Sequence, residues 1–186
     1  GAAIIITSQF SETGAAGARD ERELVELARA AGMRLLGPNC LGLFSPANGV
    51  VLSTSPALDI PTLRSGAIGL VSQSGALMAT NFDRANDLGI GCAHCVSVGN
   101  QADLEVADFI EHFIGDERVR VMCSYVEGFN DPRRILELAR QACAAGKPWF
   151  VVKAGRTAAG ERAARSHTAS LAGAYAVLEA AARDNG

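Results

Sequence analysis

The stretch from Gly66 to Leu77, GAIGLVSQSGAL, decides the fold. Its first part, Ala67–Val71, is a short apolar run, which is typical of a strand that is buried on both faces of a sheet. Small polar residues around Ser74 end the strand, and Gly75 lets the backbone approach a neighbour closely. A helix is expected over Gly75–Asn86. A buried strand that runs through a short loop into a helix is the repeating unit of a parallel α/β sheet.

The same alternation continues toward the end of the chain. Strands are expected at Cys92–Val98, Val119–Val126 and Trp149–Lys153, and helices at Leu104–Ile114, Pro132–Ala145 and Ser170–Arg183. Parallel strands that are joined by helices take right-handed crossovers, which place helices on both faces of the sheet. The sequence therefore predicts an open parallel sheet of flavodoxin-like order.

A smaller unit precedes this sheet. A buried strand is expected at Ala2–Thr7, and helical spacing follows over Arg19–Ala31. A second strand with its exit loop is expected in MRLLGPNCLG, which starts at Met33. One strand–helix–strand piece is too small to fold alone, so we expect it to be the last βαβ piece of another, Rossmann-like domain. The following segment is rich in turn formers and reads as a connection or an irregular hairpin. We therefore predict two parts, residues 1–48 and residues 49–186.

Charge and composition narrow the class of protein. Lys and Arg number 17 and Asp and Glu number 20, a net charge of −3, and no basic stripe indicates a nucleic-acid partner. No apolar run is long enough to cross a bilayer, so we expect no membrane partner. Five cysteines, an odd number, are scattered along the chain, which favours a reduced, cytoplasmic protein over a disulfide framework.

Ligands of such sheets bind at the carboxyl ends of the strands, and four loops there could carry chemistry. The helix start at Ser74 is either an anion site, because its N–H groups and dipole favour negative charge, or a plain N-cap serine. Glu127, in YVEGF, is either a site carboxylate or a surface residue. Lys153 and Arg156, in VKAGRT, either bind a phosphate or lie in a solvated loop. His167, in ARSHTASLAG, is either a reacting group or a polar residue that opens a helix.

Two nucleotide-binding motifs are missing, and one metal-binding motif is misleading. The chain has no G-x-x-x-x-G-K-[ST] and no G-x-G-x-x-G after a strand. Cys92 and Cys95 form a Cys-x-x-Cys pair, but a zinc site needs about two more ligands, and Cys123 and Cys143 do not form a second pair. Because the pair lies in an expected strand, we predict strand or core residues that bind no metal and form no disulfide with each other.

Five blocks of the sequence resemble the NDP-forming acyl-CoA synthetases. They are RLLGPNCLGLFSP, GAIGLVSQSGAL, SVGNQADLEVADFIEHF, VRVMCSYVEGF and ARSHTASLAGA. The resemblance covers nearly the whole chain and keeps the family's order of blocks. That superfamily includes the α subunit of succinyl-CoA synthetase and ADP-forming acetyl-CoA synthetase. The form SHT-x-SLAG is closer to the acetyl-CoA synthetase branch.

The resemblance implies a role for each phosphate-handling residue. His167 is similar to the histidine that is phosphorylated and carries phosphate between two active sites. Glu127 is similar to the carboxylate that orients this imidazole. Ser74, Gly75 and Ala76 match the helix N-terminus that holds the phosphohistidine. A neutral imidazole nitrogen is a good nucleophile near pH 7 when an acceptor holds its other N–H, and Glu127 suits that role.

The resemblance also implies the cofactors and partners. Asn39 and Cys40 match the loop near the reactive end of coenzyme A, and Thr7 and Ser8 match a segment whose backbone approaches coenzyme A. Residues 1–48 would then be the C-terminal part of a CoA-binding domain, and residues 49–186 the phosphohistidine domain. ATP or ADP with Mg would bind an ATP-grasp domain or subunit, fused or separate, outside this chain. A small carboxylic acid would be the substrate, and the enzyme would be an oligomer.

The implied reaction converts acyl-CoA, phosphate and NDP reversibly into carboxylic acid, coenzyme A and NTP, through an acyl phosphate and a phosphohistidine. This chain alone is not expected to turn over. One alternative is a non-catalytic CoA-binding module of a protein acetyltransferase, against which the retained His167 and Glu127 argue. The other is a serine hydrolase with Ser74 as nucleophile, but SQSGA departs from the Gly-x-Ser-x-Gly elbow.

Overall fold

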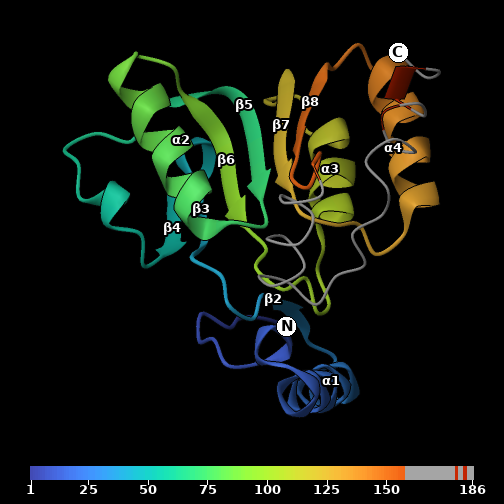
Figure 1. Ribbon diagram of the computed structural model, residues 1–186. Helices are drawn as coiled ribbons and strands as arrows, with labels where there is room; N and C mark the ends of the chain where they lie inside the picture. The colour runs from blue at the N-terminus through green and yellow to red at the C-terminus, as the bar shows by residue number, and fades with distance from the viewer. Residues whose placement is uncertain (158–178, 180–181, 184–186) are drawn as a thin grey trace.

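The computed structural model describes residues 1–157, 179, 182 and 183 (Figure 1). The strands are β1 (Ala2–Ile4), β2 (Arg34–Leu36), β3 (Gly42–Ser45), β4 (Val50–Ser53), β5 (Ser65–Ser72), β6 (Cys92–Ser97), β7 (Val121–Val126) and β8 (Trp149–Lys153). The α-helices are α1 (Ala15–Ala30), α2 (Gly75–Asp87), α3 (Val106–Gly115) and α4 (Pro132–Ala144). Single 3-10 turns lie at Ser11–Thr13, Pro46–Asn48 and Pro56–Leu58.

The main sheet has six strands in the order β4-β3-β6-β5-β7-β8. The four strands β6, β5, β7 and β8 are parallel, and β3 and β4 add an antiparallel edge. In chain order, the parallel strands lie second, first, third, fourth across the sheet, which is the start of the flavodoxin order. The predicted flavodoxin-like sheet is therefore confirmed.

Helices cover both faces of this sheet (Figure 1). Neighbouring residues of a strand point to opposite faces, and Leu70 and Val71 of β5 belong to different core clusters. Leu70 packs with Met78 and Phe82 of α2. Val71 packs in the cluster that contains Ile110 of α3 and residues of α4. Each helix therefore buries one apolar stripe against the sheet.

The parallel strands β5 to β8 and helices α2 to α4 begin and end close to their predicted positions, whereas the N-terminal helix differs. Helix α1 begins at Ala15, four residues before the predicted start. The apolar spacing that predicted the helix is clear only from Leu24, but Ala15, Ala16 and Ala18 are strong helix formers. Gly17 lies in this first turn and is buried against Phe10, where a Cβ would fall 1.9 Å from the Phe10 carbonyl oxygen.

The segment predicted as a connection or an irregular hairpin contains β4, which pairs regularly and antiparallel with β3 just before it. Strand β3 also pairs with β6, although β3 precedes the predicted boundary at residue 48. The strands of the main sheet therefore begin at Gly42. The assignment of residues 1–48 to a larger domain stays a prediction.

One buried carboxylate, that of Asp103, helps to hold the N-terminal unit on the segment that joins β6 to α3. β1 and β2 pair in parallel beside α1. Asp103, whose side chain is 2% exposed, accepts hydrogen bonds from Arg29 at 3.0 Å, from Arg34 at 2.9 Å and from the Leu35 N–H at 2.8 Å. Burial raises the pKa of Asp103, but these hydrogen bonds outweigh it and hold the pKa below its ordinary value.

Candidate functional site

The carboxyl ends of β5, β7 and β8 lie on one edge of the sheet, which we call the rim. Ser72 is in register with Tyr125, and Val126 is in register with Lys153. The loops that leave these strands therefore start side by side. The prediction that Ser74 and Glu127 lie at the same end of the sheet is confirmed.

Ser74 is the N-cap of α2. Its side chain accepts the Leu77 N–H at 3.3 Å, and Ser72 Oγ donates to the Ser74 carbonyl at 2.7 Å. Gly75 and Ala76 are the first helical residues, so their N–H groups point along the axis out of the helix. A Cβ on Gly75 would fall 2.6 Å from the Leu41 side chain, so glycine lets this helix start approach the GPNC loop. An N-cap and an anion site are compatible here, because capping uses one of several end N–H groups.

Glu127 follows β7 directly and is buried, at 8% exposure. Gln73, the residue before Ser74, joins the two loops. The Gln73 N–H donates to the Tyr125 carbonyl at 3.0 Å, and Gln73 Oε1 accepts the N–H of Glu127 and, at 3.0 Å, the N–H of Gly128. Gln73 thus ties the helix start to the carboxylate-bearing loop.

Two further side chains hold the same loop from its other sides. Gln101 Nε2 donates to the Gly128 carbonyl at 3.3 Å, and Gln101 Oε1 accepts the Val106 N–H at 2.9 Å. Lys153 Nζ donates to the Glu127 carbonyl at 2.8 Å and to the Ala154 carbonyl at 2.7 Å. Lys153 therefore contacts the backbone of the site loop.

The GPNC loop adjoins the rim. Asn39 has a left-handed φ of 55°, its N–H donates to the Thr7 carbonyl at 2.9 Å, and its Nδ2 donates to Asn100 Oδ1 at 3.2 Å. The loop that carries Asn100 also meets β5, because the Val98 N–H donates to the Ser72 carbonyl at 2.9 Å. The structure therefore brings the segments predicted for coenzyme A next to the loop predicted for phosphate.

Cys40 turns its side chain away from this surface. It is 4% exposed, belongs to the main core cluster, and its Sγ lies 3.5 Å from the Ile5 carbonyl oxygen. Burial raises the pKa of the thiol, which keeps it neutral. Only the backbone of Cys40 can face a ligand, whereas Thr7 and Ser8 are exposed.

His167 lies outside the described residues, so its position relative to Glu127 stays a prediction. The same holds for most of the helix expected at Ser170–Arg183, of which residues 179, 182 and 183 are helical. Arg156 is exposed in the loop after β8.

Cys92 and Cys95 are buried in β6 and pack on the α2 side of the sheet, as strand residues. Within the described part of the chain, the side chains that could hold a metal ion together are those of His94, His112 and Asp116. Both carboxylate oxygens of Asp116 accept hydrogen bonds from Arg118, at 2.9 and 2.7 Å. His94 Nε2 also contacts the Asp116 carboxylate, at 2.8 Å. The arrangement is an ion-pair network toward the end of the sheet opposite the rim, and a cation there would have to displace Arg118.

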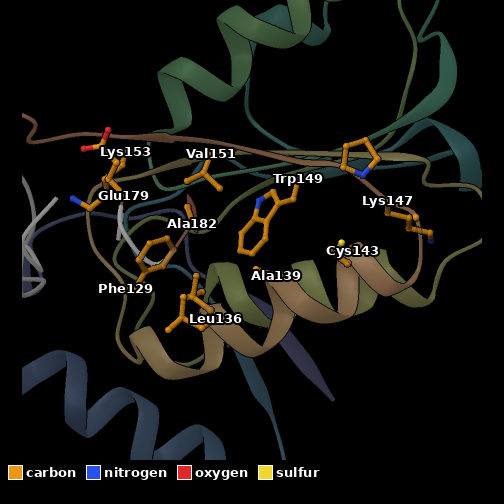
Figure 2. A pocket seen from close by; sticks show the side chains of 14 residues that line it. Phe129, Leu136, Ala139, Cys143, Lys147, Trp149, Val151, Lys153, Glu179 and Ala182 are labelled. Carbon is orange, nitrogen blue, oxygen red and sulfur yellow. The ribbon is translucent and has the colours of Figure 1, made fainter. Parts of the chain in front are cut away.

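A pocket of about 450 Å³ lies between β8 and α4 (Figure 2). Trp149 and Val151 of β8 face Leu136, Ala139 and Cys143 of α4 across it (Figure 2). The lining is mostly apolar, which suits packing better than phosphate binding. The pocket lining therefore gives no support for a phosphate site there.

The sequence pointed to Ser74, Glu127 and Asn39, but Gln73 and Gln101 were missed. Both are buried, at 6% and 3% exposure, and both bond to backbone groups far away in the chain. A buried amide between two candidate loops carries no local sequence signal. The left-handed φ of 57° at Gln101 is likewise visible only in the structure.

The fold and the rim define a class of protein, an open α/β domain of flavodoxin type whose ligand edge carries a capped helix start and a buried carboxylate. Residues 65–186 match the family described as the succinyl-CoA ligase like flavodoxin domain. The chain belongs to this family.

Relatives along the whole chain are similar as well. The chain is 43% identical over 183 residues to the acetate–CoA ligase (ADP-forming) I subunit alpha of Pyrococcus furiosus, with 98% of this chain and 38% of that relative covered. It is 39% identical over 184 residues to acetate–CoA ligase (ADP-forming) I of Archaeoglobus fulgidus, with 99% of this chain and 26% of the relative covered. The chain thus spans less than half of the length of these curated relatives.

A solved structure agrees with the described fold. The acetyl-coenzyme A synthetase 1 of Candidatus Korarchaeum cryptofilum, in complex with phosphate and ADP, superposes with a TM-score of 0.87 and is 38% identical. The match covers 97% of this chain and 38% of that one. Separately, none of the helices in the described residues is long and apolar enough to cross a membrane.

Proposed function

We propose that this chain is the part of an NDP-forming acyl-CoA synthetase that carries the phosphoryl group between two active sites. The reaction converts acyl-CoA, phosphate and NDP reversibly into carboxylic acid, coenzyme A and NTP. His167 is the carrier. Relatives of this chain are named as ADP-forming ligases, which favours ADP as the nucleotide.

The observation that carries the proposal is the pairing of two groups on one rim. A phosphohistidine needs donors for its phosphate that do not compete as nucleophiles, and the backbone N–H groups at Ser74, Gly75 and Ala76 fit that need. Its imidazole needs an acceptor that holds the second N–H, and Glu127 is a buried carboxylate a short distance away across Gln73.

The chemistry then follows from these residue types. Glu127 accepts the ring N–H, which leaves the other nitrogen of His167 with its lone pair toward the acyl phosphate. As the phosphoryl group arrives the ring becomes cationic, and the carboxylate stabilises that charge. The helix start stabilises the phosphate oxygens through N–H groups and the helix dipole.

Coenzyme A would approach the rim from the side of the GPNC loop. The exposed Thr7 and Ser8 and the backbone of Asn39 and Cys40 are the groups proposed to hold its reactive end. The neutral, buried thiol of Cys40 takes no part in this. The segment Val98–Asn100 bonds both to this loop and to Ser72, which supports a transfer path shared by both loops.

The nucleotide, with Mg, would bind an ATP-grasp part outside this chain. One relative is named as an alpha subunit, which fits a separate partner subunit, and another is a longer chain named without a subunit, which fits a fused part. The enzyme is proposed to be a cytoplasmic oligomer that takes a small carboxylic acid. A non-catalytic CoA module and a serine hydrolase are not favoured, because the whole-chain relatives are named as ligases.

The test uses the full-length enzyme with its ATP-grasp part and ATP labelled in the γ-phosphate. We expect a phosphoprotein that is labile in acid and stable in base. His167→Ala should lose the label and the overall reaction while it stays folded. His112→Ala changes an exposed histidine and is the matched control, which should keep both. Label that persists in His167→Ala would place the carrier elsewhere and overturn the proposal.

A further inference from the structure

We propose that Gln73 and Gln101 are positioning residues, which hold the Glu127–Gly128 peptide so that the carboxylate of Glu127 stays at one place on the rim. The inference rests on the proposed function, because it gives Glu127 its orienting role. It concerns two residues whose proposed effect on the reaction passes through the loop that they hold.

The first part of the hold comes from one oxygen. Gln73 Oε1 accepts two consecutive N–H groups, those of Glu127 and Gly128. Two consecutive N–H groups that converge on one acceptor require a fixed backbone conformation there. Gln73 itself is fixed by its own N–H, which donates to the Tyr125 carbonyl and extends the pairing of β5 with β7 by one residue.

The second part comes from the opposite side of the loop. Gln101 Nε2 donates to the Gly128 carbonyl, while its Oε1 accepts the N–H of Val106, the first residue of α3. Gln101 therefore links the loop to a helix start. Lys153 supplies the remaining contact, to the Glu127 carbonyl at 2.8 Å.

All four polar backbone groups of the dipeptide are thus bound by side chains. The N–H groups of Glu127 and Gly128 go to Gln73, and their carbonyls go to Lys153 and Gln101. The pairing of β7 with β5 ends at Tyr125 and that with β8 ends at Val126, so the sheet itself does not hold Glu127. Neutral amides supply three of the four bonds, which fixes the loop while adding only one charge to its surroundings.

A misplacement of about 1 Å in a catalytic group can slow a reaction by roughly a hundredfold. Gln73→Met keeps the length of the side chain and removes the acceptor. In the full-length enzyme we expect it to slow single-turnover phosphorylation of His167 from labelled ATP by roughly ten- to a hundredfold. The KM for coenzyme A should stay within about twofold, because the GPNC loop does not contact Gln73 by any hydrogen bond among the described residues.

The matched control is Gln141→Met, the same change at an exposed glutamine of α4 whose side chain bonds only Glu137 in the described part of the chain. It should leave the phosphorylation rate and the melting temperature unchanged. Gln101→Met should slow phosphorylation in the same way as Gln73→Met.

A double-mutant cycle separates positioning from a general loss of structure. If Gln73 acts through the Glu127 carboxylate, then Gln73→Met should cost little further rate in a Glu127→Gln background. Additive losses would overturn the proposal, and so would a wild-type rate in Gln73→Met.

Gln73→Glu keeps an acceptor for both N–H groups and provides a test should the Met variant fail to fold. It should recover most of the rate, because the carboxylate can accept the same two N–H groups. A Gln73→Glu enzyme as slow as Glu127→Gln would contradict the proposal. The two ideas fail separately, because an unlabelled wild-type His167 defeats the proposed function, whereas a labelled wild type with an unaffected Gln73→Met defeats only the positioning role.

Discussion

At the scale of single residues, Glu127 is a carboxylate at a position where burying a charged group costs folding free energy. It is 8% exposed at the end of a buried strand, and burial disfavours a charged group. Gln73 and Lys153 both bond to the backbone of Glu127, which supports the proposal that the loop holds this side chain at the rim.

Glu127→Gln is expected to slow phosphorylation of His167. Hydrogen bonds to charged groups contribute about 1.5–3 kcal/mol, and about 1.4 kcal/mol is a factor of ten in rate, so the expected loss is roughly ten- to a hundredfold. Single-turnover phosphorylation of the full-length enzyme measures it. Glu127→Asp should also be slow, because its shorter arm cannot reach the same place.

The control for this change is Glu137→Gln, at an exposed carboxylate of α4, which should phosphorylate at the wild-type rate. Affinity for coenzyme A should change little in either variant. A Glu127→Gln enzyme that is phosphorylated as fast as wild type would make Glu127 a bystander.

Gly99 shows how closely the GPNC loop packs against the loop that follows β6. A Cβ at this position would fall 2.2 Å from the Pro38 carbonyl oxygen and 2.4 Å from that of Asn39, and its φ is +55°. Gly89 has a φ of +75° with nothing within 4 Å of its Cβ position, so an alanine there would have the left-handed strain without a clash.

We therefore expect Gly89→Ala to cost about 1–2 kcal/mol in free energy of unfolding, the ordinary penalty of a left-handed alanine. Gly99→Ala should cost about 1–3 kcal/mol more, because backbone atoms must move. It should also raise the KM for coenzyme A in the full-length enzyme. Denaturant unfolding of both variants measures the difference in the free energy of unfolding. Equal losses in the two variants would mean that the GPNC loop moves aside without cost.

At the scale of elements, the main sheet was predictable and its accessory parts were less so. Buried parallel strands and amphipathic helices have characteristic sequence patterns. Strands β5 to β8 and helices α2 to α4 therefore begin and end within two residues of their expected positions. The pairing of β3 with β6 was missed, because antiparallel partners about fifty residues apart have no local signal.

The candidate site divides in the same way. Residues that begin a helix or end a strand, such as Ser74 and Glu127, could be found from the sequence, because those positions have local patterns. The side-chain bonds of Gln73 and Gln101, and the inward direction of Cys40, depend on loops that meet only in the folded chain. Their detection needed coordinates.

A substitution at Asp103 tests how much its ion pairs with Arg29 and Arg34 stabilise the packing of the N-terminal elements. Asp103→Asn removes the charge that Arg29 and Arg34 bind, and the variant should unfold at lower denaturant concentration than wild type at pH 7. The control is Asp20, which forms an exposed ion pair with Arg19. Asp20→Asn should unfold at the same denaturant concentration as wild type.

The effect of pH on this variant has a definite sign. The pKa of Asp103 is lowered in the folded state, so its stabilisation is present above the unfolded-state value of about 3.9 and is lost as the pH falls through the folded-state value. The difference between wild type and Asp103→Asn should therefore shrink as the pH drops below about 4. A difference that does not change between pH 7 and pH 3 would contradict this assignment.

At the scale of the whole molecule, the described residues bring together segments that are predicted for two different ligands. The GPNC loop belongs beside the small β1–β2 sheet, and the helix start and Glu127 belong to the main sheet, yet hydrogen bonds link the loops between them. A phosphoryl carrier near this junction could receive its phosphate from an acyl phosphate formed beside coenzyme A. The proposed ATP-grasp part would then take the phosphate away.

The most direct test of this account is a crystal structure of the phosphorylated full-length enzyme. We expect phosphate oxygens on His167 to lie about 2.7–3.2 Å from backbone nitrogens at the start of α2, between Ser74 and Ala76. The other ring nitrogen should lie at hydrogen-bond distance from the Glu127 carboxylate. A phosphohistidine that contacts neither group, or a phosphate on another residue, would contradict the account.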